Sequence, residues 1–292
     1  MRGNPAGHEL LAPGSLSAVL DLIASAPGQW TAIAGGTELM VAFAAGRLSA
    51  GKLVSLWGIK ELRFIHSMPD HIVIGAGTTF SDLRASGVIA SEFPLLNKAS
   101  SWIGAIANQA RATLGGNLVN GSPAADSSPA LLVYDAEVEL ISVRGRRRLP
   151  YNNFHTGYKQ NVMVADELMF AVHLPRRFSQ HHHYLRKVGT RRAMAISKVA
   201  LGATARMSGG VIDEIRIAAA SLAPFPARLY HTETALLGNA LDTQLTEAAR
   251  RVMLTEAQPI DDIRSNAQYR KHVGANLLEE FLQGLVKEPS AG

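Results

Sequence analysis

The most informative run of this chain is an apolar segment that leads into two glycines and a hydroxyl residue, Ala32-Ile33-Ala34-Gly35-Gly36-Thr37-Glu38-Leu39. The pattern predicts a strand, a turn and the start of a helix. Glycine adopts positive φ and lets another group approach the backbone closely. Successive amide N–H groups in such a turn form an anion-binding concavity, and the helix N-terminus adds partial positive charge. A diphosphate would suit this site; the alternative is an ordinary strand–turn–helix connection.

A second glycine pair occurs in the run Thr113-Leu114-Gly115-Gly116-Asn117-Leu118, and the acid Asp126 follows it near the expected start of a helix. Asp126 could cap that helix or could hydrogen-bond to ligand hydroxyls. Two glycine segments in one domain could clamp one diphosphate from both sides. Neither run is the dinucleotide pattern G-x-G-x-x-G or a P-loop.

Hydrophobic spacing predicts two α/β units in the N-terminal part, about residues 1–57 and 58–177, which together form a domain over 1–177. Residues 113–121 are rich in glycine and asparagine, and no helix or strand is predicted there. Helices are predicted over 15–26, 38–45, 81–89, 94–107 and 124–134, and strands over 31–34, 53–56, 71–74, 137–143 and 169–174.

A second domain is predicted over 178–292, because the composition changes to Arg, Ser, Gln and His around 176–183. Strands over 199–207 and 211–219, joined at Ser208-Gly209-Gly210, indicate a hairpin. Helices are expected at about 228–237, 244–255 and 267–286. The fold class is therefore α+β, with a two-subdomain N-terminal domain and a small C-terminal domain of antiparallel sheet and helices.

The triplet His181-His182-His183 invites a metal interpretation, but adjacent residues of an extended chain point to alternate sides. We therefore predict a solvated linker there and no metal site. The chain has no cysteine among its 292 residues, which excludes disulfides, Cys-ligated zinc and an iron–sulfur cluster of its own. That composition fits a reducing compartment, and we expect the cytoplasm.

Charge and hydropathy exclude two further classes of protein. The net charge is +5, but the basic runs are short and no aromatic residues alternate with them, so nucleic-acid binding is not expected. No apolar stretch approaches the roughly 20 residues that a membrane-spanning helix needs.

Taken in order, the motifs resemble those of the FAD-binding subunits of molybdenum hydroxylases, the family of xanthine dehydrogenase and carbon monoxide dehydrogenase. The two glycine runs match the family patterns A-G-G-T-[DE]-L and T-[IL]-G-G-N-L. Residues 74–83 match I-G-A-G-T-T-x-x-D-L, residues 129–138 match P-x-L-L…D-A-x-V, and residues 154–175 match F-x-x-G-Y…D-E-L…P. The resemblance covers about residues 10–240.

The resemblance implies an FAD-binding domain of the PCMH type, with FAD between its two subdomains. Residues 32–39 would hold the diphosphate and the ribityl chain. Contacts to the diphosphate and the flavin from the other side would come from Thr113, Gly115, Gly116, Asn117 and Leu118.

Further residues are implied by the same resemblance. Asp126 would belong to the FAD pocket, and Leu168 and Met169 would line the adenine or ring-edge region. Lys187 resembles a family basic residue near the flavin; a surface lysine is the alternative. No acid–base catalytic residue is expected, since the flavin carries the chemistry.

One departure from the family pattern lies just before the second glycine run. The family usually has an Arg-Asn pair there, whereas this chain has Gln109 and Ala110, with Arg111 shifted. Because of this departure, the sequence does not define the local contacts at these positions or their effect on a partner interface.

The resemblance also implies partners. A large subunit would hold the molybdenum cofactor and hydroxylate the substrate, and a small subunit would carry two [2Fe-2S] clusters. The FAD would collect electrons for NAD or another acceptor, in a dimer of heterotrimers. The alternatives are a stand-alone FAD oxidoreductase and a non-catalytic assembly subunit. The sequence identifies neither the substrate nor the acceptor.

Overall fold

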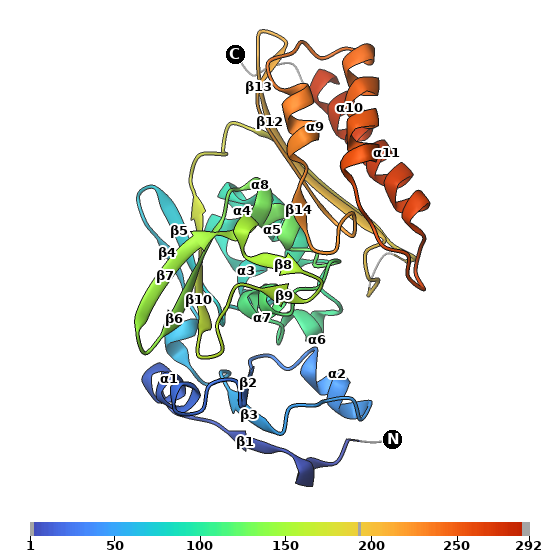
Figure 1. The fold of residues 1–292 in the computed structure, drawn as a ribbon. Coiled ribbons are helices and arrows are strands. Elements are labelled where there is room, and N and C mark those ends of the chain that lie inside the picture. Colours follow the sequence, from blue (N-terminus) through green and yellow to red (C-terminus); the bar gives the residue numbers. More distant parts are fainter. Residues whose placement is uncertain (1–2, 192–193, 288–292) are drawn as a thin grey trace.

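The computed structural model describes residues 3–191 and 194–287, and its first unit is a small parallel sheet with two helices (Figure 1). Strands β1 (Glu9–Leu11), β3 (Lys52–Ser55) and β2 (Trp30–Ile33) pair in the order β1-β3-β2. Helices α1 (Leu16–Ser25) and α2 (Leu39–Ala44) complete the unit. The four elements predicted in this region are confirmed, with ends shifted by one residue.

Helix α1 forms where the sequence predicts it because of its cap and its apolar face. The Ser15 hydroxyl accepts a hydrogen bond from the Ala18 N–H at 3.3 Å. Its apolar residues recur at i, i+3 and i+4, so they share one face of the helix, and that face packs against the neighbouring sheet. The buried residues of α1 are Leu16, Val19, Leu20 and Ile23.

The second unit is built on an antiparallel sheet of order β4-β5-β10-β6-β7. Its side chains alternate between faces, so Ile72, Ile74 and Val138 enter one core with the helices, while Ile141 packs with α1 of the first unit. The strands are β4 (Ile65–Ser67), β5 (His71–Gly75), β10 (Leu168–Pro175), β6 (Glu137–Ser142) and β7 (Gly145–Pro150).

Short helices cover this core, and several differ from the prediction. Ser86 splits the helix expected over 81–89, because its extended backbone (ψ 116°) ends one helix and its hydroxyl caps the next. The helix expected from residue 94 ends at Ser100, and the one expected from residue 124 begins at Ser128. The helices are α3 (Phe80–Ala85), α4 (Gly87–Glu92), α5 (Pro94–Ser100), α6 (Ile106–Gln109), α7 (Leu114–Val119) and α8 (Ser128–Val133).

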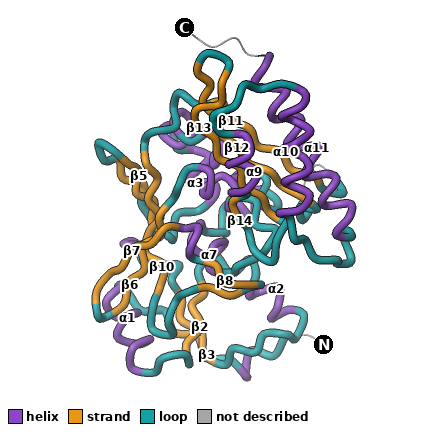
Figure 2. Tube along the Cα trace, turned by 45° about the horizontal axis from the view of Figure 1, so that its top comes forward, coloured by secondary structure: helices purple, strands orange, loops and turns teal. Residues whose placement is uncertain are grey.

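The second glycine run is helical, and the sequence analysis assigned no element to it. Thr113 caps helix α7, because its hydroxyl accepts a hydrogen bond from the Gly116 N–H at 3.1 Å. A small hairpin of β8 (His155–Gly157) and β9 (Gln160–Asn161) lies near the end of this helix, and the Asn161 amide donates to the Val119 carbonyl at 3.4 Å. Figure 2 shows β2 and β3 of the first unit directly below α7 and β8 of the second.

The C-terminal part is an antiparallel sheet with helices on one face (Figure 1). The predicted hairpin is confirmed, and its turn glycines take φ of +58° and +81°. The other face of the sheet approaches α8, where a Cβ on Gly202 would lie 3.1 Å from the Pro129 Cβ. The elements are β11 (His182–Val188), β12 (Val199–Ser208), β13 (Val211–Ala220), β14 (Ala227–Arg228), α9 (Tyr230–Leu236), α10 (Thr243–Glu256) and α11 (Ala267–Lys287). The predicted α+β class is confirmed.

The prediction of a solvated linker at His181-His182-His183 is wrong. His182 and His183 begin strand β11, which pairs with β12, and His181 is only 7% exposed. The His181 Nε2 lies 3.1 Å from the Glu214 carboxylate, and the His183 ring packs edge-on against Tyr134. Within the described ranges no three His, Asp or Glu side chains are arranged to hold a metal ion.

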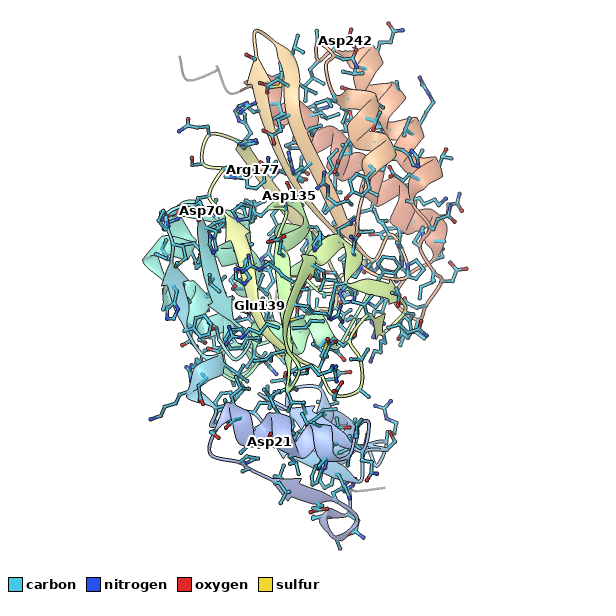
Figure 3. The ribbon with its side chains drawn as sticks, turned by 60° about the vertical axis from the view of Figure 1, so that its left-hand side comes forward. Asp21, Asp70, Asp135, Glu139, Arg177 and Asp242 are labelled. Atoms are coloured by element: carbon cyan, nitrogen blue, oxygen red, sulfur yellow. The ribbon has the colours of Figure 1, made fainter. Side chains whose placement is uncertain are left out.

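A cluster of charges joins the second unit to the C-terminal sheet. Asp135 has a left-handed backbone (φ +49°) and directs its carboxylate to three guanidinium groups. Arg216 lies 2.7 Å away and Arg228 2.8 Å away, and Arg177 is the third partner. Figure 3 shows Asp135 and Arg177 where these two parts of the chain meet.

Burial of the histidines should make stability depend on pH. Burial lowers the pKa of His183 to about 4, so below its unfolded pKa the unfolded chain binds a proton that the folded chain does not. The free energy of unfolding should therefore fall as the pH falls from about 6.5 towards 4, by up to about 1.4 kcal/mol per pH unit for this group. His183→Leu should flatten this dependence in urea unfolding measured across that range, and an unchanged slope would contradict the assignment.

Candidate functional site

The first glycine loop leaves strand β2 and meets the second unit directly. Gly36 has φ +73°, a conformation that favours glycine. A Cβ added to Gly35 would lie 1.7 Å from the Arg111 carbonyl oxygen, so no other residue fits without moving the backbone. None of the N–H groups from Gly35 to Leu39 donates to an acceptor within residues 3–191 and 194–287. Such a row of unpaired donors is what the predicted anion-binding concavity requires.

The second loop uses its own amides internally and contributes a close-packed surface. The Gly115 N–H donates to the Ala76 carbonyl, and the Leu114 N–H donates to the Thr78 carbonyl, both at 2.9 Å. A Cβ on Gly115 would lie 2.6 Å from the Ala76 Cβ. Most of the free amide donors at this site therefore come from the first loop, while the second offers the Thr113 N–H and the side chains of Thr113 and Asn117.

Two neighbouring cavities of about 330 and 300 Å³ lie between these loops, within the size range of small-molecule sites. They share Thr31, Ala32, Ala34, Thr113 and Gly116. The structure brings most of the predicted site residues to one or both cavities, namely Ala32, Ile33, Ala34, Gly35, Gly36, Thr37, Glu38, Leu39, Thr113, Gly115, Gly116, Asn117, Leu168 and Met169.

The larger of the two cavities has a mostly apolar lining, which suits a flat aromatic ring. Ile23, Trp30, Leu56 and Met163 all line it, and the sequence analysis assigned none of them to the site. They come from α1, the start of β2, the residue after β3 and the segment before β10, so only the folded chain brings them together. The smaller cavity has the first loop along its wall. One cavity beside the unpaired N–H groups and one with a mostly apolar lining fit an extended ligand with a diphosphate and an aromatic ring.

Three predicted site residues do not line either cavity. Leu118 is fully buried in the core of the second unit. Asp126 and Lys187 pair with each other, with the Lys187 Nζ 2.6 Å from the Asp126 carboxylate. The Lys187 side chain is 11% exposed, so the alternative of a surface lysine is wrong.

The Asp126–Lys187 pair joins the two domains from the inside. Lys187 lies on β11 of the C-terminal sheet, whereas Asp126 precedes α8, whose N-cap residue is Ser127. The Ser197 hydroxyl also donates to Asp126 at 2.5 Å. Burial raises the pKa of Asp126, and the Lys187 ammonium and the Ser197 hydroxyl oppose that rise.

The substituted pair before the second loop is built into the structure. Gln109 is 3% exposed; its side-chain oxygen accepts from Arg84 at 2.5 Å, and its amide donates to the Ser101 carbonyl at 3.0 Å. The first arginine after this pair, Arg111, reaches towards the first unit, where its Nε donates to the Gly35 carbonyl at 3.4 Å.

These features define a class of protein with two N-terminal α/β units, cavities of small-molecule size between them, and a separate α+β domain. Comparison with known families gives the same class. Residues 6–177 match the FAD binding domain in molybdopterin dehydrogenase, and residues 184–285 match the CO dehydrogenase flavoprotein C-terminal domain. The chain belongs to the family of FAD-binding subunits of molybdopterin dehydrogenases. It is an oxidoreductase subunit, and its cofactor is FAD.

Curated relatives align along nearly the whole chain. The xanthine dehydrogenase FAD-binding subunit of Escherichia coli O157:H7 is 32% identical over 93% of this chain and 94% of its own length. The carbon monoxide dehydrogenase medium chain of Hydrogenophaga pseudoflava is 26% identical over 95% of this chain and 96% of its own length.

Solved structures share the fold. Carbon monoxide dehydrogenase from Hydrogenophaga pseudoflava superposes with a TM-score of 0.90, at 26% identity, over 94% of this chain and 96% of that one. The reconstituted enzyme from Oligotropha carboxidovorans gives the same score at 24% identity, over 96% of each chain, which shows the fold alone. Among the described residues, no helix is both long and apolar enough to cross a membrane.

Breaking the buried ion pair should destabilise the chain. Lys187→Met leaves the Asp126 carboxylate buried without its cation, and we expect the free energy of unfolding at pH 7 to fall by about 3–5 kcal/mol in urea titrations. Asp126→Asn combined with Lys187→Met should cost less than the sum of the two single changes, because the second change removes no further pairing. Strict additivity would contradict the pairing.

Proposed function

We propose that this chain is the FAD-carrying electron-transfer subunit of a molybdenum-dependent hydroxylase. It takes electrons from the [2Fe-2S] clusters of a partner subunit and passes them to NAD or another acceptor. The single observation that carries the proposal is the row of unpaired N–H groups from Gly35 to Leu39, facing the second glycine run across a cavity. Bound FAD supplies the redox chemistry, and the protein positions it.

The residues present fit this cofactor. A diphosphate on the first loop satisfies amide donors that otherwise have no acceptor in the described chain, and the helix start at α2 adds its dipole. Gly116 lines both cavities, so its missing side chain leaves room for the ligand there. Leu168 and Met169 face the apolar compartment, where the adenine or a ring edge is placed.

Asp126 and Lys187 belong to the proposal in a supporting role. They line neither cavity, and their ion pair fixes the segment after α7 to the C-terminal sheet. This buried pair links the second unit to the C-terminal domain close behind the second glycine run in the chain. Leu118 supports the same helix from within the core.

The partners in the proposal follow from the family and from the composition. The chain has no cysteine, so clusters that reduce its FAD must come from another subunit. Relatives are named as a FAD-binding subunit and a medium chain, which supports a complex with a large molybdenum-cofactor subunit and a small [2Fe-2S] subunit. We propose a dimer of such heterotrimers, located in the cytoplasm.

A valine at Gly116 tests where FAD binds. The Gly116 side faces the cavity, and a Cβ there meets only the Thr113 hydroxyl, at 2.9 Å. Gly116→Val should reduce bound FAD from about one per chain to less than about a tenth, since the new methyl groups occupy cofactor space. Bound flavin is measured by acid release and chromatography after native purification.

The matched control is Gly87→Val, because a Cβ at Gly87 has no neighbour within 4 Å. The control should retain full FAD and an apo-protein melting temperature close to that of the parent. Gly116→Val should melt somewhat lower, because its Cβ displaces the Thr113 hydroxyl that caps α7, but should still unfold in one cooperative transition. Full FAD in Gly116→Val would show that the site is misplaced. FAD in the parent without co-purifying metals would favour a stand-alone flavoenzyme, and no flavin would favour an assembly subunit.

A further inference from the structure

We propose that Arg111 is a positioning residue for FAD: it holds the first glycine loop in its donor-presenting conformation and sets the gap between the two units. This inference rests on the proposed function. Arg111 makes three contacts across the gap. Its Nε donates to the Gly35 carbonyl at 3.4 Å, its guanidinium lies 3.7 Å from the Trp57 ring centroid, and its own carbonyl packs against the Gly35 α-carbon.

Through Trp57, the stacking contact connects Arg111 to the sheet of the first unit. Trp57 is the second residue after β3, and the residue between, Leu56, donates its N–H to the Ile33 carbonyl at 2.8 Å. The end of β3 is thereby joined to the end of β2, from which the glycine loop departs. A second arginine, Arg63, lies 6.0 Å from the same ring.

The contact to the Gly35 carbonyl orients the donors of the loop. In a trans peptide the C=O and the following N–H point in opposite directions. Because the Gly35 oxygen faces Arg111, the Gly36 N–H points away from Arg111. Gly36 lines the smaller cavity and Arg111 does not, so this orientation is the one that an anion in the cavity needs.

Arginine is the only side chain that can make both contacts of this kind. Its planar guanidinium stacks on an indole face while its Nε–H still donates in the plane. A lysine keeps the charge but has no plane to stack. Arg111 also explains how the chain manages without the Arg-Asn pair, since Gln109 fastens the preceding turn and Arg111 makes the link to the first unit.

The test is the rate at which FAD leaves the intact complex, followed as the recovery of flavin fluorescence after dilution. Arg111→Ala should speed release by about tenfold, since one stack and one hydrogen bond at an exposed site are lost. Arg111→Lys should release FAD almost as fast as Arg111→Ala. Trp57→Phe should release it at a rate between those of the parent and Arg111→Ala. Arg111→Ala combined with Trp57→Ala should release FAD no faster than about the quicker single variant.

Two readouts separate positioning from mere stability. Methylguanidinium at tens of millimolar should slow FAD release in Arg111→Ala and leave the parent unchanged, because it can refill the stacking site. The melting temperature of the apo-chain should change no more than in Arg251→Ala, an exposed arginine of α10 far from the cofactor site in the chain.

An unchanged release rate in Arg111→Ala, or full recovery by Arg111→Lys, would overturn the inference. Additive effects of the Arg111 and Trp57 changes would overturn it too, since the two residues would then act separately. Loss of FAD in Gly116→Val together with normal release in Arg111→Ala would defeat this inference alone. Retention of FAD in Gly116→Val would defeat the placement of the site on which it rests.

Discussion

The contact between the Gly35 α-carbon and the Arg111 carbonyl is the constraint on which the proposed cofactor site depends. It brings two units with separate sheets within backbone contact, at a distance that excludes even one methyl group. The unpaired amides of the first loop and the close-packed surface of the second therefore face one another. Each loop alone is a common glycine turn, and the binding cavity exists only where they meet.

Ion pairs between residues distant in sequence help to hold the C-terminal domain against the second unit. Asp135 gathers three arginines near the top of the second unit, and Asp126 pairs with Lys187 close to α7. Such pairs repay their desolvation only when the geometry is kept, because a single unpaired member is costly. Docking of the C-terminal sheet and order around the second glycine loop are therefore linked energetically.

Local signals predicted much of this structure. Ser15 and the apolar face behind it determined α1, and the glycines after β12 determined its hairpin, because caps and turns act over a few residues. Helix α7 received no prediction; its two glycines lower helix propensity, yet the Thr113 cap and packing on Ala76 outweigh that cost. Strand β11 was missed because its order comes from pairing with β12.

In the candidate site too, residues marked by local motifs were predicted, and residues brought together only by the fold were not. The motif residues around the two glycine pairs were predicted, and most of them line the cavities. Trp30 and Leu56 were not, since nothing near them in sequence marks them as cavity residues. The pairing of Asp126 with Lys187, and the stack of Arg111 on Trp57, join residues distant in sequence and required the folded chain.

The most direct test of the account is the cofactor content of the natively purified complex. Flavin is released with acid and identified by chromatography, and iron and molybdenum are counted in the same sample. The account predicts one FAD per chain, with iron and molybdenum carried by co-purifying subunits. A complex that holds iron and molybdenum but no flavin would contradict it, because the cavity between the two glycine loops would then have another purpose.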